Sequence, residues 1–186
     1  MLENKFGYFL NAVHYCMWLS ERKFGKFMEK MIDLLFAPIQ KYLFTKSFKE
    51  KYYKHLPIEI EATNKYLYDS EQGLSIGGAN YEFGYFYSGY SIFLSFVFIG
   101  VANRFFEGLP PLLDFLLIAL PVIVCYIPAY SAVFSNDRYL KYFKQFEKEN
   151  EHWHKKWRKI TVLFIIGSVV STIMGFMVMW GIEHLL

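Results

Sequence analysis

The stretch ITVLFIIGSVVSTIMGFMVMWGI, residues 160–182, contains no charged side chain and decides the class of this protein. Two further uncharged windows precede it, at 83–103 and 115–136, and the three windows are 21, 22 and 23 residues long in chain order. An α-helix rises 1.5 Å per residue, so about 20 apolar residues cross a hydrocarbon core of roughly 30 Å. We therefore predict an all-α integral membrane protein with three transmembrane helices, at about 85–106, 111–134 and 160–182.

The composition favours the same class. Of 186 residues, 54% are hydrophobic and 21% are aromatic, which excludes a disordered chain because disorder requires low hydrophobicity. Cys16 and Cys125 allow one disulfide at most, so a disulfide scaffold is excluded and both are interpreted as small buried apolar residues. Three buried helices in a soluble core are the alternative, which we disfavour because too few other residues remain to cover them.

The lysine and arginine residues predict the orientation of the spans. Eleven lie in residues 1–84 and eight in residues 135–159, whereas the connection between the first two spans holds only Arg104. Positively charged residues accumulate on the cytoplasmic side of a membrane. We therefore expect region 1–84 and an amphipathic helix over 135–159 to be cytoplasmic, the Arg104–Asp114 hairpin to lie outside, and the protein to occupy a bacterial inner membrane.

Region 1–84 is predicted to be a cytoplasmic or interfacial amphipathic helical region. Its apolar stretch 6–19 is short for a span, so we expect it to lie in the interface or to pack on a partner, with an additional span as the alternative. Residues 69–80, rich in Gly, Ser and Asn, are predicted to form a loop. Apolar residues at helical spacing predict one apolar helix face: Phe24, Met28, Met31, Leu35, Ile39 and Leu43.

Residues 44–55 interleave lysines with aromatic side chains. This mixture can bind nucleic acid through phosphate contacts and stacking, but beside a bilayer it suits an anionic headgroup surface. We favour the membrane surface, then a protein partner. The nearly balanced charge of 20 Lys+Arg against 17 Asp+Glu also gives no indication of nucleic acid as a partner.

Small residues and prolines mark two of the predicted spans. Gly167, Ser171 and Gly175 recur every fourth residue, the spacing that lets helix backbones approach closely in lipid. We predict a helix-packing face there, either within the chain or between copies. Pro121 and Pro128 are predicted hinges because each removes a helical hydrogen bond; a bent packing helix is favoured over a cavity or gate.

The search for catalytic chemistry finds no pattern that predicts an enzyme. His152 and His154 point about 200° apart on a helix, so they cannot hold one metal ion there. Asp114 follows two prolines and is expected to cap or begin the second span. We predict no catalytic residue, no metal ligand and no cofactor, and the anchor and pore interpretations below are favoured over an enzyme.

A basic cluster precedes the third span. We expect it to contact the anionic membrane surface and fix the orientation, with docking of an acidic partner as the alternative. Trp153 and Trp157 are expected at headgroup depth beside it. The cluster consists of Lys155, Lys156, Arg158 and Lys159.

Two functions agree with these features. In the first, the chain is a non-catalytic anchor or accessory subunit that holds a partner at the cytoplasmic membrane face, with the lipid bilayer and other protein subunits as its partners. In the second, copies self-associate through the small-residue face into a pore or channel-like effector. The pore needs a polar stripe facing the lumen, and the first span offers Ser88, Ser91 and Ser95.

Overall fold

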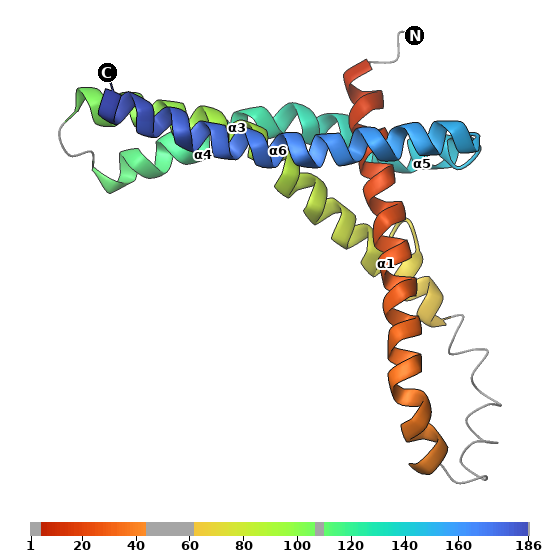
Figure 1. Cartoon of the computed structure of the whole chain (residues 1–186). Helices are drawn as coiled ribbons and strands as arrows, with labels where there is room; N and C mark the ends of the chain where they lie inside the picture. The colour runs from red at the N-terminus through yellow and green to blue at the C-terminus, as the bar shows by residue number, and fades with distance from the viewer. Residues whose placement is uncertain (1–4, 44–61, 107–109, 186) are drawn as a thin grey trace. The chain divides into compact units, whose positions relative to one another are not determined.

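The computed structural model describes residues 5–43, 62–106 and 110–185, with side chains at all of them except 37–43 and 185 (Figure 1). Three helical stretches, beginning at Leu74, Pro111 and Glu151, are long and apolar enough to cross a membrane. The predicted all-α class with three candidate spans is therefore confirmed over the described residues. The lysine-aromatic segment 44–55 lies outside them. Residues 62–68 are helical, and the other helices are α1 (Lys5–Leu43), α3 (Leu74–Phe105), α4 (Pro111–Val133), the 3₁₀ helix η1 (Ser135–Asp137), α5 (Arg138–Phe146) and α6 (Glu151–Leu185).

The chain divides into two compact units, which are described separately. The span unit comprises Met1–Cys16 and Tyr81–Leu186, and the helix-turn unit comprises Met17–Asn80. Both α1 and α3 contribute to each unit. The span unit holds α4, α6 and most of α3, and the helix-turn unit holds α1 from Met17 onward and the first residues of α3.

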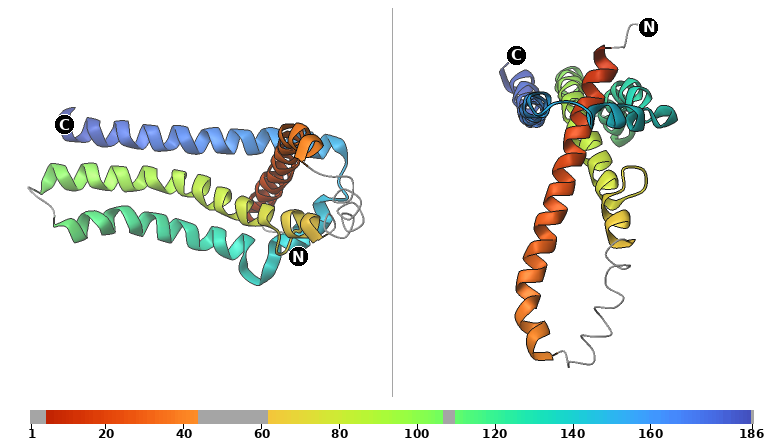
Figure 2. Two further views of the ribbon diagram at one scale, coloured as in Figure 1. Left: turned by 90° about the horizontal axis from the view of Figure 1, so that it is seen from below. Right: turned by 90° about the vertical axis from the view of Figure 1, so that its right-hand side faces the viewer.

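Within the span unit, α3, α4 and α6 run side by side and alternate in direction (Figures 1 and 2). The amide of Asn103 near the end of α3 donates to Glu183 near the end of α6, at 2.7 Å. The α4–α5 junction lies at the other end of the three helices. Both regions that the sequence predicts to be cytoplasmic, the entry to the first span and residues 135–159, therefore meet the spans at the same end.

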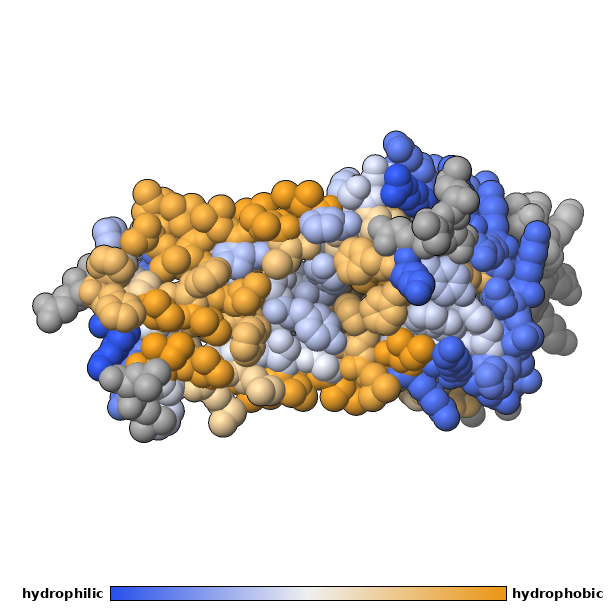
Figure 3. All heavy atoms as spheres, turned by 90° about the horizontal axis from the view of Figure 1, so that it is seen from above, coloured by the Kyte–Doolittle hydropathy of each residue, from blue (hydrophilic) through white to orange (hydrophobic). Residues whose placement is uncertain are grey.

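The outer surface of the spans is apolar. Large hydrophobic side chains stay exposed on α4, such as Phe115 at 64% and Val124 at 62%, and on α6, such as Leu163 at 65% and Met177 at 64%. Figure 3 shows hydrophobic surface over the spans and hydrophilic atoms gathered towards the end that carries α5. Such a surface is suited to acyl chains, because backbone polar groups are already satisfied inside the helices.

The start of α4 agrees with one of the two roles expected of Asp114. Pro110 is the N-cap of the helix, and Pro111 is its first residue. The fixed φ of a proline suits this first helical position. Asp114 lies in that first turn and makes no capping hydrogen bond, so it begins the helix and does not cap it. Its carboxylate there interacts favourably with the positive end of the helix dipole.

The single amphipathic helix predicted over 135–159 is not what the structure contains. The chain leaves α4 through η1, where Asn136 (φ 55°) and Asp137 (φ 51°) adopt left-handed conformations that these two residue types tolerate. After α5, the Asn150 side chain accepts a hydrogen bond from the Trp153 amide at 2.8 Å and so caps α6. Residues 151–159 are therefore the first turns of the third candidate span.

The loop predicted over 69–80 is shorter in the structure. Asp69 Oδ1 accepts hydrogen bonds from the amides of Glu71 and Gln72, at 2.7 and 2.9 Å, and α3 begins five residues after Asp69, at Leu74. These two hydrogen bonds hold the pKa of Asp69 below its usual value. A Cβ at Gly73 would lie 2.5 Å from the Asp69 carbonyl oxygen, so this tight turn requires glycine. Gly77 and Gly78 are helical, contrary to expectation.

Candidate functional site

The predicted helix-packing residues of α6 lie on or near its contact with α3. A Cβ at Gly175 would come within 2.9 Å of Phe93 Cα and 3.0 Å of the Phe96 ring, and one at Gly167 within 2.5 Å of the Tyr90 hydroxyl. Gly175 is buried, whereas Gly167 and Ser171 are half-buried. The structure thus places both glycines against α3 of the same chain.

The partner face of α3 contains small residues that the sequence analysis missed. A Cβ at Gly100 would lie 3.0 Å from Met179 Cα, and one at Gly89 would collide with the Ser168 hydroxyl. Gly89 and Gly100 are 11 residues apart, almost exactly three helical turns, so they share one face. Their spacing is the sequence pattern that could have predicted this contact face of α3. We call the contact between these faces the α3–α6 seam.

Hydroxyl groups tie the α3–α6 seam together. Tyr90 donates to the carbonyl of Phe164 at 2.6 Å, and Thr172 donates to the carbonyl of Gly89 at 3.2 Å. In a bilayer interior, helices attract one another mainly through close van der Waals packing, which small residues at the contact allow, and through hydrogen bonds across the contact. The seam therefore has both elements of a stable membrane helix pair.

The two predicted hinges of α4 face different surroundings. Pro121 is buried and Pro128 is exposed, and both lie inside a continuous helix. Ser95 donates to the carbonyl of Ile118 at 2.9 Å, and Tyr87 donates to the carbonyl of Cys125 at 3.2 Å. Each accepting carbonyl lies three residues before a proline.

This repeated placement has a physical reason. A proline removes a hydrogen bond of the preceding turn and pushes its backbone aside. Carbonyls near the break can then accept from a neighbouring helix. The hydroxyls of Tyr87 and Ser95 thus fasten α4 to α3 one residue after Val124 and Leu117, whose carbonyls the two prolines leave without their helical donor.

The groove beside Pro121 is apolar. It lies between α3 and α4, has a volume of about 440 Å³, and has no charged or amide side chain in its lining. Acyl chains suit such a surface better than water or ions do. Its lining is Leu94, Phe98, Leu116, Leu117, Leu120, Pro121, Val124 and Cys125.

We expect Ser95→Ala to lower the free energy of unfolding of the protein in detergent by about 0.6 kcal/mol and by at most about 1.7 kcal/mol. These are the average and the largest contributions found for hydrogen bonds between membrane helices. The effect should shrink in a Pro121→Ala background, because a regular α4 uses its carbonyls internally. A double-mutant cycle measured by thermal unfolding checks this. Equal losses of stability in both backgrounds would show that the contribution of the Ser95 hydrogen bond does not depend on Pro121.

Aromatic side chains join the N-terminal part of α1 to α5 and α6. Phe146 stacks on Trp153 with ring centroids 4.7 Å apart, and the Trp153 indole donates to the Tyr8 hydroxyl at 3.0 Å. Trp157 is 9% exposed and contacts Tyr8 and Phe9. We call this cluster the aromatic junction. Trp157 is buried and Trp153 is half-buried in this cluster. Their expected position at headgroup depth stays a prediction.

The aromatic junction explains the short apolar stretch 6–19. Asn11 is fully buried, and its amide donates to the carbonyls of Gly7 and Ala132, at 2.7 and 3.1 Å. His14 is fully buried among aromatic rings 5.3–5.5 Å away. Residues 7–16 pack within the span unit, whereas Phe6 is 42% exposed. Among the described residues, α1 is not one of the helices long and apolar enough to cross a membrane, and the additional span stays a prediction. The rings around His14 belong to Phe83, Phe134, Tyr139 and Phe143.

The predicted basic cluster remains on the surface. Lys155, Lys156, Arg158 and Lys159 are all exposed at the start of α6. Lys155 forms an ion pair with Glu151 at 2.8 Å, and the Arg158 guanidinium donates to the His154 carbonyl at 3.3 Å. Exposed pairs of this kind contribute little to stability, so these cations are available to anionic headgroups or an acidic partner.

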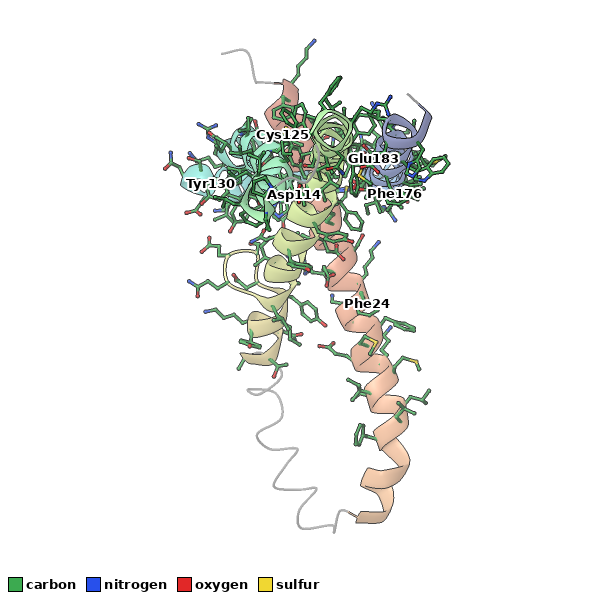
Figure 4. The ribbon with its side chains drawn as sticks, turned by 90° about the vertical axis from the view of Figure 1, so that its left-hand side faces the viewer. Phe24, Asp114, Cys125, Tyr130, Phe176 and Glu183 are labelled. Atoms are coloured by element: carbon green, nitrogen blue, oxygen red, sulfur yellow. The ribbon has the colours of Figure 1, made fainter. Side chains whose placement is uncertain are left out.

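The helix-turn unit presents an exposed apolar face on α1. Leu34 is 69% exposed and Phe24, labelled in Figure 4, is 59% exposed. The polar residues of this part of the helix, among them Lys26, Glu29 and Asp33, follow the opposite face by helical spacing. Four positions of the predicted stripe are exposed here, Phe24, Met28, Met31 and Leu35, and its positions 39 and 43 lie outside the described side chains. The amphipathic region as a whole stays a prediction. The exposed members are Phe24, Phe27, Met28, Met31, Ile32, Leu34, Leu35 and Phe36.

Within the described residues, no group of three or more His, Cys, Asp or Glu side chains could hold a metal ion. His152 and His154 lie in the first turn of α6, and Cys16 and Cys125 form no disulfide among the described residues. A scan against protein-family models found no match, and neither did comparisons with curated proteins and with solved structures.

Proposed function

We propose that the protein is a non-catalytic membrane anchor or accessory subunit that holds a protein partner at the cytoplasmic face of a bacterial inner membrane. The observation that supports this proposal is the exposed apolar face of α1 in a chain that already has three candidate spans. Eight large hydrophobic side chains between Phe24 and Phe36 are exposed, and surfaces of this kind mark interaction sites.

The pore alternative lacks a polar stripe in the described part of the chain. Ser91 and Ser95 are buried, and the Ser88 hydroxyl donates to the Gly84 carbonyl of its own helix at 2.7 Å. Ser95 is occupied by its hydrogen bond to α4. The surface beside the Pro121 hinge is also apolar. These contacts favour an anchor over a pore.

Mass measurement of the protein purified in mild detergent tests the proposed function. An anchor is expected to co-purify with a different chain at fixed stoichiometry. A closed ring of identical copies would instead support the pore, and a monomer that never acquires another chain would refute the anchor. The variant Gly175→Ile, which disturbs the α3–α6 seam, serves as the control for loss of folded protein.

The orientation is tested separately by thiol labelling in intact cells, in a chain with Cys16 and Cys125 replaced by serine. Gln145 and Arg104 are both exposed. Gln145 belongs to α5 and Arg104 to the last turn of α3, and these two elements lie near opposite ends of the spans. We expect Gln145→Cys to resist a membrane-impermeant thiol reagent and Arg104→Cys to react, because the basic residues gather on the cytoplasmic side. The reverse labelling pattern would overturn the proposed orientation.

A further inference from the structure

A groove in the helix-turn unit lies between α1 and the turn that leads into α3. It has a volume of about 330 Å³, at the small end of the range for ligand sites. Its lining is mainly apolar, with Phe24, Met28 and Ile32 from α1 and Leu67 and Leu74 from the other side. The groove continues the exposed apolar face of α1 into a concave surface.

Two buried hydroxyl groups line this groove. Ser75 is 7% exposed, and its hydroxyl has no hydrogen-bond partner among the described residues. Tyr68 is 9% exposed, and its hydroxyl lies beside the Glu29 carboxylate. Burial, and then the nearby Glu29 carboxylate, raise the pKa of Tyr68 to about 12, so its phenol stays protonated at neutral pH. Buried polar groups are nearly always hydrogen-bonded, which indicates that an occupant supplies a polar partner to Ser75.

The carboxylates that line the groove favour an occupant that carries a positive charge. Glu21 and Glu29 line it, and its lining contains no lysine or arginine. Two cations on the same part of α1 are directed at aromatic rings: Arg22 lies 4.7 Å from the Trp18 ring centre, and Lys26 lies 5.7 Å from that of Tyr68. An anionic lipid headgroup would meet two carboxylates in the groove, whereas a cationic side chain would pair with them.

We propose that this groove binds an apolar segment of a partner protein that carries a lysine or arginine, with its apolar side chains between α1 and Leu67–Leu74 and its cation beside Glu21 and Glu29. The inference rests on the proposed anchor function and specifies the chemistry of the partner. The hydroxyls of Tyr68 and Ser75 can bond to polar groups of the same segment.

The test uses the full chain in nanodiscs of zwitterionic lipid and two fluorescent amphipathic peptides that differ only in charge, one of leucine and lysine and one of leucine and glutamate. We expect the lysine peptide to bind and the glutamate peptide to bind at least tenfold more weakly. The double variant Glu21→Gln/Glu29→Gln should weaken lysine-peptide binding about tenfold. Asp33→Asn is the matched control, because Asp33 lies on the same helix but does not line the groove.

Three results would overturn the inference: equal binding of both peptides, equal effects of the double variant and Asp33→Asn, or no binding of either peptide. A dye on Met28→Cys separates a lipid occupant from a peptide. A blue shift on adding anionic lipid without peptide would assign the groove to the membrane surface. If the lysine peptide binds but no other chain co-purifies, the groove proposal stands and the anchor function is refuted. If another chain co-purifies but the lysine peptide does not bind, the anchor function stands and the groove proposal is refuted.

Discussion

Replacing Gly175 by isoleucine is expected to lower the free energy of unfolding in detergent by about 1–3 kcal/mol, the usual cost of overpacking a contact. Even the first added carbon would lie 2.9 Å from Phe93 Cα. That atom belongs to the backbone of α3, which cannot rotate away as a side chain can. The α3–α6 seam must therefore separate, and we expect reduced accumulation of the protein while membrane insertion continues, because the window stays apolar.

The size of this effect should depend on what each glycine faces. At Gly167 the nearest atom is the Tyr90 hydroxyl, which belongs to a movable side chain, so Gly167→Ile should cost less than Gly175→Ile. Gly77 is the matched control, because it is helical and a Cβ there meets nothing within 4 Å. We expect Gly77→Ala to be neutral or stabilising by up to about 1 kcal/mol, as measured by thermal unfolding. Equal losses for Gly77→Ala and Gly175→Ala would contradict the close approach in the seam.

The candidate spans could be predicted from the sequence because a bilayer imposes a length and a polarity on a single helix. Residues 160–182 satisfy both requirements without reference to any other part of the chain. The small-residue spacing at Gly167, Ser171 and Gly175 could be recognised for a similar local reason. Which helix packs there could not be predicted, because the choice depends on the complementary shape of α3, where Gly89 and Gly100 are 11 residues apart.

The region 135–159 shows where local reasoning fails. Its aromatic residues recur at helical spacing, which predicts one helix, but two short signals interrupt it. Asn136 and Asp137 tolerate left-handed backbone, and Asn150 caps the next helix. The packing of Trp153 and Trp157 against the start of α1 could not be predicted either, since a tryptophan near a span end suits a headgroup layer and a protein interior equally well.

The second large effect is expected at Phe146, the last residue of α5. Its side chain is fully buried, and its ring lies 4.7 Å from Trp153, 5.3 Å from Tyr8 and 5.6 Å from Tyr15. It therefore contacts two other segments, the start of α1 and the start of α6. Truncation of a buried phenylalanine to alanine costs about 3–5 kcal/mol, because apolar contacts are lost and a cavity remains.

We expect Phe146→Ala to lower the midpoint of thermal unfolding in detergent far more than Phe105→Ala, whose side chain is 77% exposed. Phe146→Leu should fall between them, because leucine keeps part of the apolar volume but loses the stacking on Trp153. Tryptophan fluorescence reports the same event locally, since Trp153 gains access to water when the aromatic junction opens. If Phe146→Ala and Phe105→Ala shifted the midpoint equally, residues 5–16 would not be held by the aromatic junction, and the stretch 6–19 would again be a candidate for the membrane interface.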